Sequence, residues 1–205
     1  MKKLFAVVTA FLVVAFYAAS AWSAVIDFED ISAGTPYGDL PAGYAGFNWS
    51  TYLWHYDPDI LQIQYPEIVG SGYDLGVLEH KAIFTAYCMP GSMSAISGKF
   101  NFEGAYITSA WRESEDVIVE GWNGGSLMYS RTVTTHNDAP YWFDFDFNNI
   151  DKVIFNPGEP PGCPSRGHLV IDNIKTSTVP EPATMALFGI GGLVMTLARR
   201  AKRQN

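Results

Sequence analysis

Short apolar and aromatic runs, interrupted every few residues by glycine, proline or asparagine, constrain the fold of this chain more than any other feature. Runs of this length suit β-strands, whereas helices need longer amphipathic stretches. Turn sequences such as Asn123-Gly124-Gly125 and Asn156-Pro157-Gly158 separate them. The runs are Ala24–Phe28, Gly46–Trp49, Lys81–Tyr87, Ala95–Phe102, Ala105–Trp111, Val117–Trp122, Ser126–Thr134, Tyr141–Phe147, Lys152–Asn156 and His168–Lys175.

About ten strands at this spacing predict an all-β domain, an antiparallel β-sandwich of jelly-roll type whose two sheets bury one core. With 48% hydrophobic and 17% charged residues, the chain has enough apolar material for such a core. The segment from Asp57 to Glu79 is the least regular part. We expect a long loop there, with at most one short strand and no helix of normal length.

Residues 1–23 have the pattern of a secretory signal peptide. Two lysines precede an apolar stretch from Leu4 to Ala19, and small residues follow it. Cleavage after Ala21 and cleavage after Ser23 both satisfy the small-residue requirement. An uncleaved membrane anchor is the alternative, although the apolar run is short for a membrane span.

Residues 179–205 combine three elements in a fixed order. The triplet Pro180-Glu181-Pro182 is followed by sixteen uncharged residues, 183–198, and then by a basic tail that begins with Arg199 and Arg200. A helix over the uncharged stretch spans about 24 Å, against ~30 Å for a hydrocarbon core, so we expect a single transmembrane helix with local bilayer thinning. The basic tail would stay in the cytoplasm, which leaves the domain 24–178 outside the inner membrane.

These elements resemble a PEP-CTERM sorting signal, and the resemblance covers only residues 179–205. It implies that the Pro-Glu-Pro triplet is the recognition site of an exosortase, a membrane transpeptidase of Gram-negative bacteria that make exopolysaccharide. It also implies export, transient anchoring, and release or transfer to the cell surface or extracellular matrix. It assigns no activity to the domain 24–178.

That domain is strongly acidic. The whole chain has a formal net charge of −8, but its terminal segments hold six of the 13 basic residues. The 7 basic and 20 acidic side chains of residues 24–178 give a net charge of −13. Such a surface repels nucleic acid and anionic lipid, and it attracts divalent cations.

The only two cysteines, Cys88 and Cys163, both lie in the exported domain. In an oxidising compartment we expect them to form a disulfide rather than two free thiols. Closing a loop of about 75 residues would stabilise the fold by ~4 kcal/mol in the chain-entropy model.

Acidic side chains near both ends of the domain predict a structural Ca²⁺ site. Asp27 and Glu29 lie at the first strand and Asp172 lies on the last. This arrangement is similar to the calcium sites of extracellular jelly-roll carbohydrate-binding and galactose-binding-like modules. Strand alternation places Asp172 on the face of Val170 and Ile174, where a buried carboxylate would need a partner. Alternatively, the intervening residues face inward and Asp172 is solvated.

Trp49, Trp54 and Tyr56 are the candidate glycan-binding residues. They belong to a stretch of four aromatic rings in eight residues, directly after a glycine-containing loop. Sugar rings have apolar faces edged by hydroxyl groups, so exposed aromatic rings beside Asp and Asn suit a glycan. The alternative is ordinary packing within an aromatic-rich sandwich.

No catalytic motif occurs in the sequence. We therefore expect a non-enzymatic exported protein with a structural or glycan-binding role in an exopolysaccharide matrix. The alternative is a secreted polysaccharide hydrolase that uses Asp or Glu carboxylates. Asp144 and Asp146 could meet its spacing requirement, since alternation in Tyr141–Phe147 turns them outward with Trp142, but a solvated face is the favoured interpretation because nothing in the sequence raises the pKa of either carboxyl group.

Overall fold

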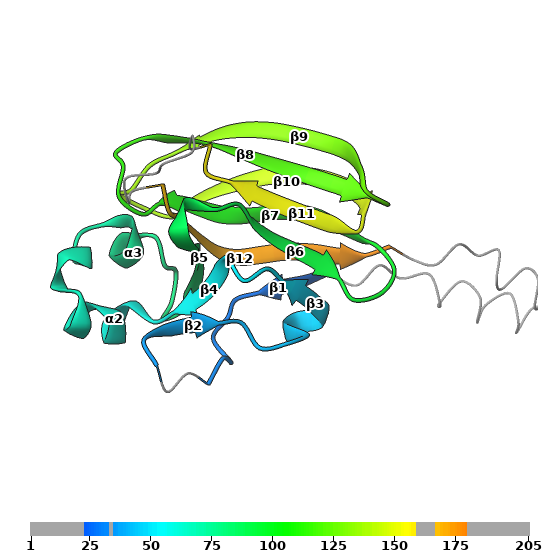
Figure 1. The fold of residues 1–205 in the computed structure, drawn as a ribbon. Helices are drawn as coiled ribbons and strands as arrows, with labels where there is room; N and C mark the ends of the chain where they lie inside the picture. The colour runs from blue at the N-terminus through cyan, green and yellow to red at the C-terminus, as the bar shows by residue number, and fades with distance from the viewer. Residues whose placement is uncertain (1–22, 33–34, 159–166, 180–205) are drawn as a thin grey trace, which may run out of the picture. The chain divides into compact units, whose positions relative to one another are not determined.

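Two antiparallel sheets form a β-sandwich in the computed structural model, which describes residues 23–32, 35–158 and 167–179 (Figure 1). The seven-stranded sheet has the order β10-β7-β12-β5-β4-β2, with β1 paired to β12, and the five-stranded sheet has the order β3-β6-β11-β8-β9. The predicted all-β, antiparallel class is confirmed. The strands are β1 (Ser23–Ile26), β2 (Tyr37–Asp39), β3 (Phe47–Trp49), β4 (Leu53–Tyr56), β5 (Ala82–Thr85), β6 (Gly91–Ala95), β7 (Phe100–Ser109), β8 (Glu115–Asn123), β9 (Ser126–Thr135), β10 (Tyr141–Ile150), β11 (Lys152–Asn156) and β12 (Leu169–Thr178).

The strand boundaries differ from the predicted runs in two ways. Two predicted strands, 95–102 and 105–111, contribute to one ten-residue strand, β7. Three short strands, β2, β4 and β6, were not predicted because their sequences are too short or too polar to alternate clearly. The predicted alternation in β10 is confirmed, since Phe145 and Phe147 are buried whereas Asp144 and Asp146 are exposed.

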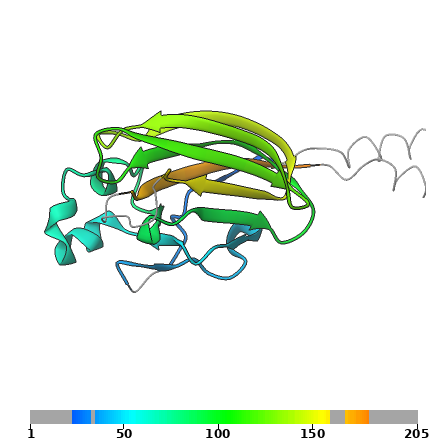
Figure 2. The ribbon, with the colours of Figure 1, turned by 45° about the horizontal axis from the view of Figure 1, so that its top comes forward.

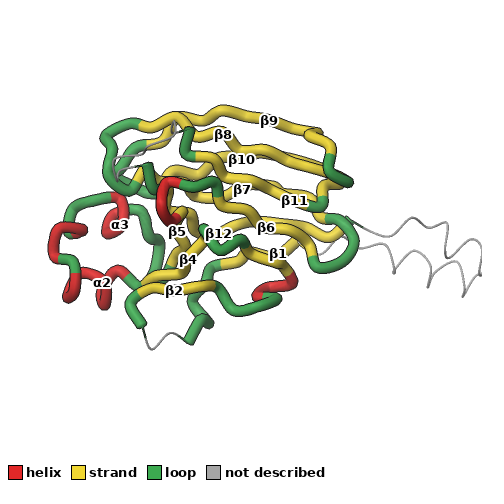
Figure 3. The backbone as a smooth tube through the Cα atoms, in the orientation of Figure 1, coloured by secondary structure: helices red, strands yellow, loops and turns green. Residues whose placement is uncertain are grey.

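The segment between β4 and β5 is helical, so the predicted long loop was wrong (Figure 3). It contains α2 (Pro58–Gln64), η2 (Pro66–Ile68) and α3 (Gly72–Leu75), while η1 (Tyr44–Gly46) and η3 (Ala86–Cys88) are single turns elsewhere. Asp57 caps α2, because its carboxylate accepts hydrogen bonds from the backbone N–H groups of Asp59 and Ile60. An Asp followed by Pro is a helix-start signal in its own right.

The main core lies between the sheets. Side chains from the seven-stranded sheet, such as Phe102 and Ile107, pack there with Val119 and Phe155 of the five-stranded sheet. The helical segment lies at one end of the strands (Figure 2). A second apolar cluster joins this segment to the outer face of the seven-stranded sheet. Its members include Tyr56, Leu61, Tyr73, Phe84 and Val170. Both faces of β4 and β5 are therefore buried.

A bulge in β12 changes which way its side chains face. Asn173 has a positive φ of 46°, and the pairing with β7 shifts between Asp172 and Lys175. Val170 belongs to the outer cluster, but Ile174 belongs to the main core. The prediction that Asp172 shares a face with both residues was wrong, because the extra residue of a bulge reverses the alternation.

Candidate functional site

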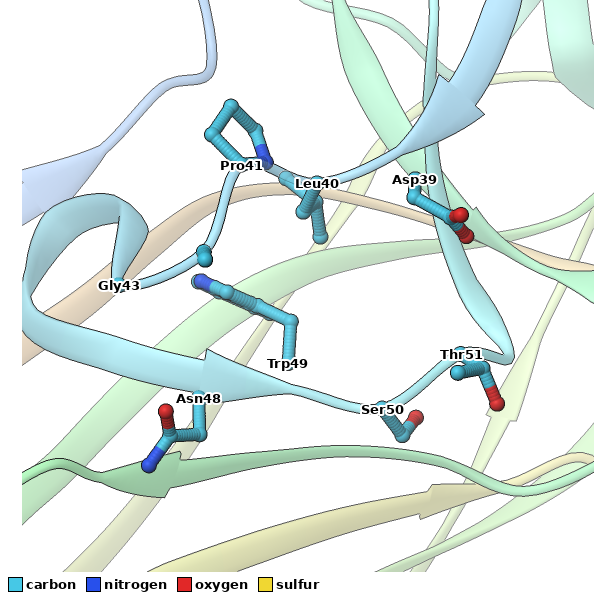
Figure 4. A pocket seen from close by; sticks show the side chains of 9 residues that line it. Asp39, Leu40, Pro41, Gly43, Asn48, Trp49, Ser50 and Thr51 are labelled. Carbon is cyan, nitrogen blue, oxygen red and sulfur yellow. The ribbon is translucent and has the colours of Figure 1, made fainter.

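A groove of about 290 Å³ lies where the chain leaves β2 and where it leaves β3 (Figure 4). One side is formed by Asp39 and the loop Leu40–Gly43, and the other by Asn48, Trp49, Ser50 and Thr51. The volume is at the lower end of the range for small-molecule sites, about 300 Å³. The groove therefore suits a single small ring rather than a large ligand.

Trp49 forms the apolar wall of this groove. Its indole reaches from β3 towards the Pro41–Gly43 loop (Figure 4), and Nε1 donates a hydrogen bond to the carbonyl oxygen of Tyr44 at 3.0 Å. Its other contacts are with core rings, including Phe28 at 5.9 Å between centroids. The ring is thus held rigidly between the core and the groove, as a preorganised stacking surface requires.

Several polar residues line the groove together with Trp49. Asp39 is exposed, so its carboxylate can exchange water for ligand hydroxyl groups. Asn48 is also exposed, but its amide points to the opposite side of β3 from the indole (Figure 4). Ser50 is held in place, because its hydroxyl oxygen accepts a hydrogen bond from the backbone N–H of Ser92 at 2.9 Å. An aromatic wall with a carboxylate beside it suits a sugar ring, which has an apolar face edged by hydroxyl donors.

Trp54 lies on the other sheet and outside this groove. Its ring stacks on Tyr37 at 5.6 Å with an interplanar angle of 11°, and Nε1 donates to the carbonyl oxygen of Thr51. Tyr87, which is 66% exposed, meets the ring edge-on at 5.3 Å. Because Tyr37 covers one face of the indole, at most one face remains for a ligand.

Tyr56 is buried completely, which excludes the predicted role of its ring as a surface platform. Its hydroxyl group donates to the carbonyl oxygen of Tyr73 at 3.0 Å, and its ring packs edge-on against Tyr73 and Phe84. Burial raises the pKa of Tyr56 well above its ordinary value. The helical segment that covers it was expected to be a loop, which is why the burial was not anticipated.

The acidic residues predicted to bind calcium lie at one corner of the sandwich. The Glu29 carboxylate accepts hydrogen bonds from the backbone N–H groups of His80 and Lys81, at 2.9 and 2.7 Å. The Lys81 ammonium group donates to the carbonyl oxygens of Glu29 and Ile31, at 2.8 and 2.9 Å. Asp27 is exposed. Within the described ranges no group of three or more His, Cys, Asp or Glu side chains is placed to hold a metal ion, and calcium binding remains a prediction.

Asp172 is 2% exposed and has partners, so the solvated alternative does not hold. Its carboxylate accepts hydrogen bonds from the backbone N–H groups of Leu78 and Asn173, at 2.9 and 2.7 Å. Burial raises the pKa of Asp172 to about 6, and the negative charges of Glu29 and Asp27 add to this effect against the two hydrogen bonds. The carboxylate thereby links β12 by a hydrogen bond to Leu78, which follows α3.

Cys88 ends the single turn η3 and is half-buried, and the described part of the chain contains no free cysteine. Its predicted partner Cys163 lies outside the described residues. The Cys88–Cys163 disulfide therefore remains a prediction.

Sequence patterns identified Trp49 but not the polar residues beside it. Asp39 lies in a three-residue strand and Asn48 alternates with Phe47 and Trp49, so neither carries a local signal of ligand contact. The groove forms because the chain returns from the Leu40–Gly43 loop to place Trp49 beside Asp39. Only a hint was present in the sequence, namely the glycine-containing loop directly before the aromatic stretch.

Comparison with solved structures finds β-sandwich proteins of similar size. A mutant of a family 29 carbohydrate binding module is 18% identical over 78% of this chain and 92% of its own length, with a TM-score of 0.41. A DUF4465 family protein from Bacteroides ovatus is 12% identical over 77% of this chain and 88% of its own, with a TM-score of 0.46. No curated protein matches the chain.

The predicted sorting signal is found independently by comparison with protein families. None of the described segments contains a helix long and apolar enough to cross a membrane. The predicted signal peptide (except Ser23, which begins β1), the transmembrane helix and the residues Pro180 to Arg200 lie outside those segments. A family model for the PEP-CTERM protein-sorting motif matches residues 178–203, which contain the Pro-Glu-Pro triplet, the apolar stretch and most of the basic tail. The chain thus carries a PEP-CTERM protein-sorting motif, which indicates an exported protein that is anchored in a membrane before an exosortase processes it.

Proposed function

We propose that this protein is a non-catalytic component of the cell surface or exopolysaccharide matrix, whose β-sandwich binds glycan through the groove beside Trp49. The sorting motif supports delivery to the outside of the cell. The groove supports the binding role, and it is the observation on which the proposal depends.

The groove suits a neutral sugar. Its wall is one aromatic ring, and its rim offers Asp39 and Asn48 without a basic side chain. A net charge of −13 on residues 24–178 opposes the approach of an anionic glycan. Hydroxyl groups can donate to the Asp39 carboxylate, while the apolar face of the sugar covers the indole.

A hydrolase is not favoured by the same geometry. Glycoside hydrolysis needs two carboxyl groups on opposite sides of the bond, and among the described residues Asp39 alone lines this groove with a carboxylate. The carboxyl group whose pKa is raised, that of Asp172, is buried against backbone N–H groups and does not line the groove. The described lining of the groove therefore supplies one carboxyl group where an acid and base pair would need two.

The test is retention of the full chain, in mild detergent, on gels that contain a neutral polysaccharide or the exopolysaccharide of the host cells. Asp39→Ala changes an exposed side chain, so we expect normal folding and a binding constant about tenfold weaker. Glu67→Ala changes an exposed carboxylate on the helical segment and serves as the control, with unchanged retention.

Retention of Asp39→Ala at wild-type strength would refute the assignment of this groove. Absence of retention on every glycan, with or without Ca²⁺, would leave a structural matrix role without binding. Release of reducing ends from the polysaccharide would support the hydrolase alternative, and its loss in Asp39→Ala would place the activity in the groove.

A further inference from the structure

A second groove, of about 360 Å³, lies on the outer face of the seven-stranded sheet. It is lined by Val25, Tyr106, Trp142, Asn173 and Lys175, which come from β1, β7, β10 and β12. The helical segment covers the β4 and β5 side of this face, where its apolar cluster lies. The groove thus occupies the part of the face formed by β10, β7, β12 and β1.

Trp142 lies against the backbone of the neighbouring strand. A Cβ atom at Gly104 would stand 2.4 Å from Cζ2 of the indole, so only glycine permits the ring to pack this closely. Indole Nε1 donates to the Asp144 carboxylate at 2.7 Å, and the ring of Tyr106 meets the indole at 5.2 Å and 64°. Two aromatic rings therefore form a fixed corner that opens outward from the sheet.

The charges at this corner are paired. Lys175 bonds to Glu103 at 2.9 Å, and each partner shifts the pKa of the other so as to favour the charged form. The Asp144 carboxylate also lies at this corner and accepts the hydrogen bond from Trp142. Because no unpaired cation faces the groove among these residues, an anionic ligand gains little there, whereas a hydroxyl group can join each charged pair.

We propose that this corner is a second glycan-binding platform, which takes a neutral polysaccharide chain with a sugar ring stacked on Trp142 and Tyr106. The platform and the Trp49 groove lie on different strands, because β5 and β4 separate β12, which lines the platform, from β2 at the sheet edge. One domain can then hold two chains and cross-link them. The ligand class rests on the proposed function, but the residues are independent of the Trp49 groove.

The experiment is calorimetric titration of the full chain, in mild detergent, with neutral gluco- and manno-hexasaccharides, together with turbidity of the parent polysaccharides. We expect two sites per chain. Trp142→Ala should weaken one of them about tenfold or more, because it removes a stacking ring. Lys175→Ala should weaken the same site several-fold while leaving the fold intact, since this side chain is 43% exposed.

Trp122→Ala is the matched control. Trp122 also donates its Nε1 to a carboxylate two residues away, that of Glu120 at 3.0 Å, but it lines neither groove. Its substitution should leave both sites and the turbidity unchanged.

The outcomes separate the two proposals. One site that is lost in Trp142→Ala but kept in Asp39→Ala supports the platform and refutes the Trp49 groove. One site that is lost in Asp39→Ala but kept in Trp142→Ala refutes the platform. Wild-type binding stoichiometry in both Trp142→Ala and Lys175→Ala also refutes the platform. The platform is refuted as well if the chain self-associates and Trp142→Ala abolishes that self-association without changing glycan binding.

Discussion

Replacement of Asp172 by Asn should reveal a pH-dependent stability that the structure places in one carboxyl group. Asp172 is 2% exposed, and its pKa of about 6 in the folded protein compares with an ordinary value of 3.8. Because the folded state holds the proton more tightly, this group contributes stability at low pH. That contribution is lost as the pH rises through about 6.

The size of the effect follows from the two pKa values. At about pH 4 the group adds roughly 2 kcal/mol to the free energy of unfolding, and at about pH 7.5 it adds almost nothing. Asn cannot ionise, and its carbonyl oxygen can still accept a hydrogen bond from Leu78 or Asn173. The wild-type protein should therefore lose about 2 kcal/mol more than the Asp172→Asn variant over this pH range.

Urea unfolding at a series of pH values, followed by circular dichroism, measures this difference directly. Glu67→Gln, which changes an exposed carboxylate, serves as the control and should follow the wild-type profile. Parallel profiles for wild type and Asp172→Asn would refute the reasoning, because they would mean that burial does not raise the pKa of Asp172.

Three further predictions concern the rest of the domain. Lys81→Met should lower the free energy of unfolding by about 2 kcal/mol, because the ammonium group bonds to two backbone carbonyl oxygens. If this ammonium group takes the place of a metal ion beside Glu29, EDTA will leave the melting temperature of the wild-type protein unchanged. A lower melting temperature in EDTA would establish the predicted calcium site. Asp57→Ala should destabilise the protein by about 1 kcal/mol through loss of the α2 cap, with Asp57→Asn close to wild type in the same urea titration. Mass spectrometry of the exported protein under alkylating conditions should find no free thiol, and labelling of either Cys88 or Cys163 would contradict the predicted disulfide.

Local patterns predicted the strand content well and the helical segment poorly. In β10, alternation was enough to assign Phe145 and Phe147 to the core, since each residue faces opposite to its neighbour. The segment from Asp57 onward was taken as a loop because α2 and α3 are short, with 7 and 4 residues. Their position depends on packing over Tyr56 and Phe84 rather than on helix propensity.

By itself, the sequence determined the all-β class, the acidity of the domain and the sorting motif, because strand alternation, charge and a linear motif are properties of short stretches of chain. Only the tertiary structure decided how the candidate residues are grouped. Trp49 and Trp54 are five positions apart but belong to different sheets, since the chain crosses from one sheet to the other between them. Asp172 and Trp142 owe their surroundings to a bulge in β12 and to Gly104 of a neighbouring strand. Register, bulges and close contacts arise from pairing between strands that are distant in the chain, which no local pattern encodes.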